Sequence, residues 1–331
     1  MRILPTSGSG DVHSMGKRIQ IPAPDFDLAK TLDSGQVFHW EKSGDGFVGT
    51  IGNMPVYLEQ EGDVLRALSG AFQLDWLNQS SFENVVSKYF ALDHPLREIC
   101  ASFPNDPAMN AARAFCRGLR IIRQPKWECL ATFICSSMKQ VAHIRQISHK
   151  LRERFGDSRQ IGDEIVYLFP SVERIAASSE KELRKCALGY RAKNLLATAR
   201  QIASGAVDLE ALAALSDSDL CGLLCELPGV GAKVANCVML FAYERLSAFP
   251  IDVWIERVLR EKYFPRARKL NAARLQVFTR EYFGPHGGYA QQYLFHHART
   301  TRRQGDGGPV NKTRIKRKRK SGRFVTVSGV K

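Results

Sequence analysis

Two residues in the carboxyl-terminal third of the chain, Lys233 and Asp252, have types and surroundings suited to covalent chemistry. Lys233 follows a Gly-Val-Gly turn in the stretch LPGVGAKVANC, at the start of a predicted helix. The helix dipole disfavours a positive charge in the first helical turn, and an uncharged amine is a nucleophile. The sequence therefore predicts that Lys233 is placed to act as a nucleophile.

Asp252 lies nineteen residues after Lys233, in the stretch FPIDVWIERV. An aspartate directly before a helix commonly serves as its N-cap, and Asp252 fits that structural role. A carboxylate held near the amine can also stabilise a cationic sugar, as carboxylates do in glycoside hydrolysis. The spacing leaves both roles open.

The lysine belongs to a predicted pair of helices, 218–227 and 232–244, joined by Gly229, Val230 and Gly231. Ser216 or Asp217 can cap the first helix, and Pro228 stops it. The glycines permit backbone angles closed to other residues and a close approach of another backbone. Bare amides at the positive end of a helix dipole bind phosphate without a side chain. The hairpin is therefore expected to bind phosphate, and LPGVGAKVA resembles the helix-hairpin-helix motif of DNA-binding proteins; an ordinary glycine-rich corner is the alternative.

The elements that position these residues follow from length and periodicity. The chain has 331 residues, 44% of them apolar, which is enough for about two domains with packed cores. Residues 37–68 alternate apolar and polar with Gly, Asp and Asn turns, which predicts a half-buried antiparallel meander. From Leu74 onward the apolar spacing is helical. The predicted fold class is α+β, a small N-terminal antiparallel β-sheet domain followed by a mostly α-helical bundle that contains the helix-hairpin-helix.

The same patterns predict the boundaries. Helices are expected over 127–156, 172–188, 192–204, 218–227, 232–244, 253–263, 272–283 and 289–300. The expected division is a disordered N-terminus (1–18), a sheet domain (19–110), a helical domain with the helix-hairpin-helix (111–300) and a basic flexible tail (301–331).

Charge is concentrated at one end of the chain. The net charge is +15, and residues 299–331 contribute +11 from twelve basic residues and one acidic residue. Such a tail is either solvated or lies on a polyanion. The start of the chain lacks a secretion signal, and no run reaches about 18 uninterrupted apolar residues. We expect an intracellular monomer found with DNA, in the bacterial cytoplasm and nucleoid or in a nucleus, with no membrane partner.

Eight cysteines are present, none of them in a C-x-x-C pair and none beyond Cys237. This spacing argues against zinc ribbons and against a cysteine-ligated iron–sulfur cluster. Most of these cysteines are expected to be small buried side chains in a reducing compartment. We expect neither a metal site nor a cofactor.

LPGVGAKVA, followed at this distance by PIDVW, resembles the helix-hairpin-helix base-excision glycosylases that carry a Gly/Pro-Asp signature. Members with lysine at this position are bifunctional, and the likeness to the 8-oxoguanine DNA glycosylases runs from about Phe26 to Arg299. The resemblance implies that Lys233 attacks the anomeric carbon, expels the damaged base and holds the sugar as a Schiff base. Strand cleavage by β-elimination follows. Asp252 would be the electrostatic partner, and double-stranded DNA containing oxidised guanine the substrate.

Three segments resemble the pocket of that family for the flipped-out base. In TLDSGQVFHW, Gly35 is the glycine whose carbonyl accepts the N7 hydrogen that 8-oxoguanine has and guanine lacks. In GYAQQYLFHHAR, Gln291 and Phe295 fall on the family's base-contacting positions, and Cys237 of LPGVGAKVANC matches the family cysteine that flanks the flipped base. By spacing alone, Gln291 and Phe295 are ordinary surface and core residues, and a Gly-Gln turn before a strand explains Gly35 equally well.

The segment LGYRAKN resembles the one that fills the hole left by the flipped base. Tyr190 would wedge into the stack and Arg191 would contact the orphaned base. The family usually has three asparagines after ICSS and an arginine beyond them, whereas this chain has Met138 and His143 at the first and last of these positions. Methionine cannot hydrogen-bond a base edge. We predict a weaker preference for cytosine opposite the lesion, which excision rates on the four opposing bases test.

Two alternatives remain at this point. A relative with the same fold could excise another lesion, such as an alkylated base or an oxidised pyrimidine. A non-catalytic helix-hairpin-helix protein would keep the hairpin and the basic tail but has no use for Lys233 and Asp252 together. Covalent trapping by borohydride on damaged duplex separates enzyme from binding module.

Overall fold

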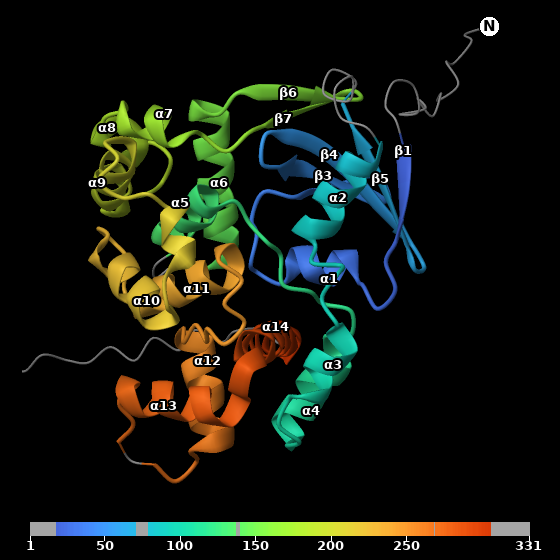
Figure 1. Ribbon diagram of the computed structural model, residues 1–331, viewed down its shortest axis with the longest axis vertical. Coiled ribbons are helices and arrows are strands. Elements are labelled where there is room, and N and C mark those ends of the chain that lie inside the picture. Colours follow the sequence, from blue (N-terminus) through green and yellow to red (C-terminus); the bar gives the residue numbers. More distant parts are fainter. Residues whose placement is uncertain (1–17, 71–78, 137–139, 268, 306–331) are drawn as a thin grey trace, which may run out of the picture.

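The computed structural model describes residues 18–70, 79–136, 140–267 and 269–305. Met138, the tail beyond residue 305 and nearly all of the predicted disordered N-terminus lie outside the described residues. Within the described part, an antiparallel sheet with the helices Leu28–Asp33 and Gln79–Tyr89 packed on it occupies one side of the molecule, and most other helices occupy the other side (Figure 1). This confirms the α+β class.

The sheet is a meander closed at one edge by the first strand. Its order is β1-β5-β4-β3-β2, and each neighbouring pair is antiparallel. Gly44, Gly52 and Gly62 have positive φ in the three tight turns, where glycine has no steric penalty. The strands are β1 (Arg18–Pro22), β2 (Glu41–Ser43), β3 (Gly46–Ile51), β4 (Met54–Glu61) and β5 (Val64–Ser69).

The helices form a second, larger core around α5, α9, α11 and α14. None of the helices within the described residues is long and apolar enough to cross a membrane. The helices are α1 (Leu28–Asp33), α2 (Gln79–Tyr89), α3 (Leu96–Ala101), α4 (Pro107–Phe115), α5 (Lys126–Ser136), α6 (Val141–Phe155), α7 (Val172–Ala176), α8 (Glu180–Arg184), α9 (Arg191–Ala203), α10 (Asp217–Glu226), α11 (Ala232–Ala242), α12 (Val253–Val258), α13 (Ala272–Phe283) and α14 (Gly287–Gly305), with a π-helical turn, Leu259–Tyr263, continuing α12.

Two predicted helices are each divided in the structure. The run 127–156 becomes α5 and α6, because Gln140 is extended (φ −79°, ψ 153°) and starts α6 as its N-cap. The run 172–188 becomes α7 and α8, because Ser179 and Glu182 form a reciprocal capping box that begins a new helix. Both predictions of a single helix were wrong, since extended backbone at Gln140 and a capping box at Ser179 interrupt the continuous apolar period.

A two-stranded hairpin, β6 (Ser158–Ile161) and β7 (Glu164–Tyr167), lies within the predicted helical domain and was not predicted. Figure 1 shows it reaching from the helical side across to the sheet, where β6 packs near β4 and β7 near β3. A Cβ at Gly70 would lie 2.8 Å from the Gln160 carbonyl oxygen, so the two backbones meet closely. The hairpin ties the two cores together.

Candidate active site

The helix-hairpin-helix forms as predicted, with two corrections, at Gly231 and at Val230. Ser216 is the N-cap of α10. Two observations require glycine at position 229: its φ is +84°, and a Cβ there would lie 2.8 Å from the Asn194 Cβ. Gly231 has φ −107° and ψ 179°, which any residue adopts, and space beside it is open. Of the two glycines, only Gly229 uses the backbone freedom that the sequence indicated. The Val230 amide is also not bare, since it donates to the Leu227 carbonyl at 3.0 Å.

Lys233 lies in the first turn of α11, where the sequence placed it. Its Nζ donates to the Ser136 hydroxyl oxygen at 3.2 Å and lies 5.1 Å from the centroid of the Phe133 ring. The Ser136 hydroxyl in turn donates to the Phe133 carbonyl. A neutral oxygen and an aromatic face at the end of α5 therefore hold the amine.

Asp252 is the N-cap of α12, as predicted, and its Oδ1 accepts from the Ile255 amide at 2.8 Å. Removal from water raises the pKa of its carboxyl, while the cap hydrogen bonds and the charge of Lys233 oppose that rise. The ion pairs among the described residues do not include Lys233 with Asp252. The two groups thus share an electrostatic environment without a direct contact.

Cys237, one turn after Lys233 on α11, is only 3% exposed. Burial raises the pKa of its thiol to about 11, and Lys233 is its hydrogen-bonding neighbour. The Asp252 charge also reaches it. Lys233, Cys237 and Asp252 therefore form one cluster at the adjoining ends of α11 and α12.

A second group of predicted residues gathers where α14 meets the segment after α1. Gly35 has φ +86°, and a Cβ there would lie 3.0 Å from the Phe295 ring. Gln291 is 4% exposed, and its Oε1 has no hydrogen-bond partner among the described residues. Because α12 packs against α14, this group and the Lys233 cluster lie on neighbouring helices.

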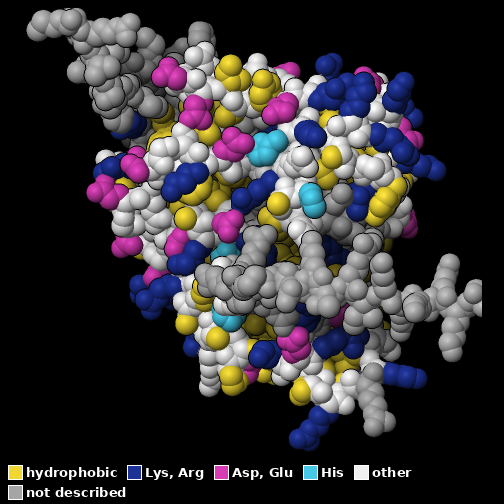
Figure 2. All heavy atoms as spheres, turned by 180° about the vertical axis from the view of Figure 1, so that it is seen from behind, with side chains coloured by type: hydrophobic (Ala, Val, Ile, Leu, Met, Phe, Trp, Pro, Cys, Tyr) yellow, Lys and Arg dark blue, Asp and Glu magenta, His cyan; other side chains and the backbone are white. Residues whose placement is uncertain are grey.

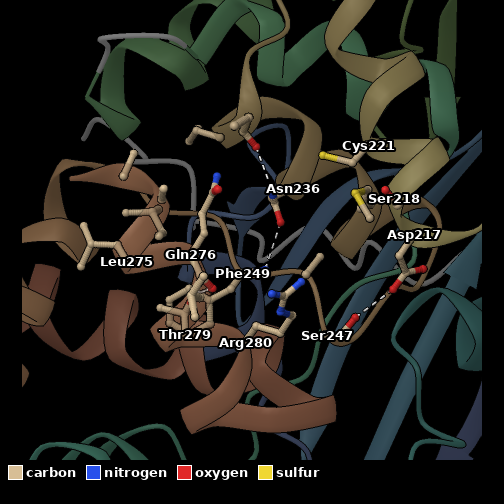
Figure 3. Close-up of a pocket in the computed structure, with 18 of the residues that line it drawn as sticks. Asp217, Ser218, Cys221, Asn236, Ser247, Phe249, Leu275, Gln276, Thr279 and Arg280 are labelled. Atoms are coloured by element: carbon tan, nitrogen blue, oxygen red, sulfur yellow. Dashed lines mark hydrogen bonds between the residues drawn. The ribbon is translucent and has the colours of Figure 1, made fainter.

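An open cavity of about 740 Å³ adjoins Lys233 on another side (Figure 3). Its walls are α10, α11, α13 and the segment 247–251, and Figure 3 shows Cys221, Asn236 and Arg280 around it. Gly35, Gln291 and Phe295 are not among its lining residues. This cavity is therefore not the predicted base pocket.

Comparison with known proteins agrees with this geometry. Residues 18–130 match the family described as 8-oxoguanine DNA glycosylase, N-terminal domain, and residues 131–279 match the HhH-GPD superfamily of base excision DNA repair proteins. N-glycosylase/DNA lyase OGG1 of Arabidopsis thaliana is 31% identical over 89% of this chain and 84% of its own length. The chain belongs to the 8-oxoguanine DNA glycosylase family.

Solved structures resemble this glycosylase over most of its length. The 8-oxoguanine glycosylase/lyase of Clostridium acetobutylicum, in complex with double-stranded DNA containing cytosine opposite 8-oxoguanine, is 32% identical with a TM-score of 0.78. The comparison covers 84% of this chain and 93% of that one. MBOgg1 in complex with a DNA ligand is also 32% identical, with a TM-score of 0.79 over 86% of this chain and 96% of that chain.

The remaining predicted residues of the glycosylase differ in their exposure to solvent. Tyr190 is 58% exposed, whereas Arg191 is only 5% exposed, with its guanidinium 4.4 Å from the Tyr190 ring centroid. His143 is exposed in the first turn of α6, and Met138 lies outside the described residues. Lys and Arg side chains gather on the side where Figure 1 places α7 to α9 (Figure 2), and Lys181 and Arg184 are exposed there.

Three residues of the glycosylase site were missed by the sequence reasoning. Phe133 and Ser136 contact the Lys233 amine from α5, nearly a hundred residues earlier in the chain. Asn236 bonds to the segment that leads to Asp252. Of the three, only Ser136 could have been found from the sequence, because it belongs to the ICSS stretch that directly precedes the positions where this chain differs from the family.

Proposed function

We propose that this glycosylase excises 8-oxoguanine from duplex DNA and then cleaves the strand, with Lys233 as the nucleophile. The names of its relatives support both activities. The observation that carries the residue assignment is the Lys233 amine, tethered to Ser136 beside Asp252 but not ion-paired with it. An amine without a carboxylate partner keeps its lone pair accessible for attack once it is deprotonated.

The chemistry follows from these positions. The amine attacks the anomeric carbon as the N-glycosidic bond breaks, and the bonding electron pair leaves with the base. The Asp252 carboxylate stabilises the positive charge that develops on the sugar. Opening of the sugar ring gives a Schiff base on Lys233, and loss of a C2′ proton then expels the 3′ phosphate.

Recognition of the base is assigned to the second group of residues. The Gly35 carbonyl accepts the N7 hydrogen of 8-oxoguanine, a buried hydrogen bond that discriminates by about 1 to 3 kcal/mol. The unpartnered Oε1 of Gln291 is an acceptor for the Watson–Crick edge, and the Phe295 ring stacks on the base. Cys237 flanks it from α11. A Cβ added at Gly35 would lie 3.0 Å from the Phe295 ring, so the base enters by parting these two residues.

The hairpin and α9 provide the contact with DNA. The amides near Gly231 and the start of α11 face a backbone phosphate, and exposed Tyr190 enters the stack. Arg191 reaches the orphaned base once Tyr190 has moved off its guanidinium. We infer that the protein acts as a monomer on DNA inside the cell. Weaker preference for cytosine opposite the lesion stays a prediction.

Borohydride trapping on a duplex with 8-oxoguanine opposite cytosine tests the assignment. Wild-type protein is expected to form a covalent adduct, and Lys233→Gln none, because the only change is loss of the nucleophilic amine. Lys42→Gln, an exposed lysine of β2, is the matched control and keeps the adduct. An adduct in Lys233→Gln contradicts the nucleophile, and trapping only with another lesion contradicts the substrate.

A further inference from the structure

Asn236 joins the helix that carries Lys233 to the segment that carries Asp252. Its Nδ2 donates to the Ala232 carbonyl at 2.8 Å, and its Oδ1 accepts from the Phe249 amide at 3.2 Å. Figure 3 shows both bonds as dashed lines on Asn236, which lies in the cavity wall above Phe249. One side chain thus binds the residue before Lys233 and the residue three before Asp252.

The segment that donates the Phe249 bond to Asn236 is stiff. Pro250 fixes its own φ and follows Phe249 directly. The Phe249 ring is 7% exposed and stacks on Phe283 with centroids 4.9 Å apart. Three residues before Phe249, the Leu246 carbonyl accepts a hydrogen bond from the Gly288 amide at 2.7 Å. A displacement of the Phe249 amide is therefore passed to Asp252 rather than absorbed by the loop.

The primary amide is suited to this position because it donates and accepts at the same time. Alanine does neither, and an ionised aspartate can only accept. Asn236 is half-buried in a cavity wall, so filling space does not explain its type. Both of its bonds run to backbone atoms, so they fix backbone positions at the two ends of the site.

We propose that Asn236 is a positioning residue that sets the separation between the Lys233 amine and the Asp252 carboxylate. The inference rests on the proposed function. Direct contact would hold the amine as an ammonium in an ion pair, and an ammonium has no lone pair for attack. A wider separation would remove the carboxylate from the developing positive charge. The Asn236 bridge maintains the intermediate arrangement in which the two groups interact without pairing.

Single-turnover excision of 8-oxoguanine by Asn236→Ala tests the proposal, with DNA affinity and thermal unfolding measured on the same samples. The rate is expected to fall about 10- to 100-fold, the usual effect of a shift of about 1 Å between reacting groups. DNA affinity is expected to stay within twofold, since the Gly229 turn and the bond from the Val230 amide to the Leu227 carbonyl, which shape the hairpin, do not involve Asn236. Asn236→Asp keeps the bond from the Phe249 amide and is expected to recover part of the rate.

Asn110→Ala is the matched control, because Asn110 on α4 also uses its amide group locally and lies far from the site in sequence. A rate in Asn236→Ala equal to that of Asn110→Ala overturns the proposal. So does an equal loss in Asn236→Ala and Asn236→Asp that tracks a drop in melting temperature, because that pattern indicates stability alone. Failure of the proposed function is distinguishable, since it appears as no adduct and no excision in the wild-type protein.

Discussion

At the residue scale, the charge state of Asp252 is the property that a single substitution can isolate. Aspartate and asparagine cap helices about equally well, so Asp252→Asn keeps the bond to the Ile255 amide and the start of α12. The substitution removes only the negative charge. We expect the excision rate to fall about 100-fold, the lower end of the cost of losing one electrostatic stabiliser of a transition state.

The pH dependence gives a second measurement on the same variant. Burial raises the pKa of Asp252 above its usual value, so the wild-type rate is expected to fall as the pH drops through that raised pKa and the carboxylate is protonated. Asp252→Asn has no such group and is expected to lack this acid limb. Asp106→Asn, the cap of α4, is the control. An unchanged acid limb in Asp252→Asn would show that another group titrates.

At the element scale, the two glycines of the hairpin have different tasks. Gly229 adopts φ +84° against Asn194, whereas Gly231 is extended beside open space. Gly229→Ala is expected to cost about 1 to 3 kcal/mol of unfolding free energy from backbone strain alone. Gly231→Ala is expected to stay within about 0.5 kcal/mol, as exposed substitutions do.

Urea unfolding of the two variants measures the difference between their unfolding free energies. Measuring their DNA affinity as well tests whether either glycine contributes to DNA binding. If Gly231 is there to let a phosphate approach, its alanine variant folds normally but binds duplex more weakly. Equal unfolding free energies for the two variants would contradict the backbone argument. Normal DNA affinity in Gly231→Ala would contradict the idea that a DNA phosphate approaches the backbone closely at Gly231.

At the scale of the whole molecule, a buried polar cluster joins the sheet to the helices. Arg152 of α6 pairs with Glu128 of α5 and donates to the Thr50 hydroxyl on β3 at 3.0 Å. His39 contacts the Thr50 carbonyl at 2.9 Å and the Glu128 carboxylate at 3.3 Å. The cluster fixes α5, and with it the end that presents Ser136 to Lys233.

The contribution of His39 to the unfolding free energy is expected to fall in mild acid. Burial, followed by the Arg152 charge, lowers the pKa of His39 well below 6.5. Below about pH 6.5 the unfolded chain takes up a proton on this histidine while the folded protein does not. The unfolding free energy then drops by up to about 1.4 kcal/mol per pH unit for this one group.

His39→Gln removes this contribution. The measurement therefore compares the slope of unfolding free energy against pH in wild type with the slope in His39→Gln, rather than their absolute stabilities. Glu128, whose pKa is raised by burial, contributes a slope of opposite sign above about pH 4.5 in both proteins. His143→Gln, an exposed histidine, serves as the control. A slope in His39→Gln as steep as that of wild type would mean that other groups cause the loss.

The sequence by itself determined the local features of this glycosylase. The N-cap at Asp252, the placement of Lys233 in a first helical turn and the alternating strands depend on neighbours within a few residues. Side chains one helical turn apart also meet by rule, which placed Cys237 beside Lys233. Such contacts are readable because chain geometry fixes them.

Only the tertiary structure decided the contacts between distant segments. It brought Ser136 to the Lys233 amine and Gly35 to Phe295, and it buried Arg191 beneath Tyr190. It also divided the predicted helices, since a continuous apolar period does not show where extended backbone or a capping box interrupts it. These contacts depend on how whole elements pack, and residue types and spacing along one segment do not encode that packing.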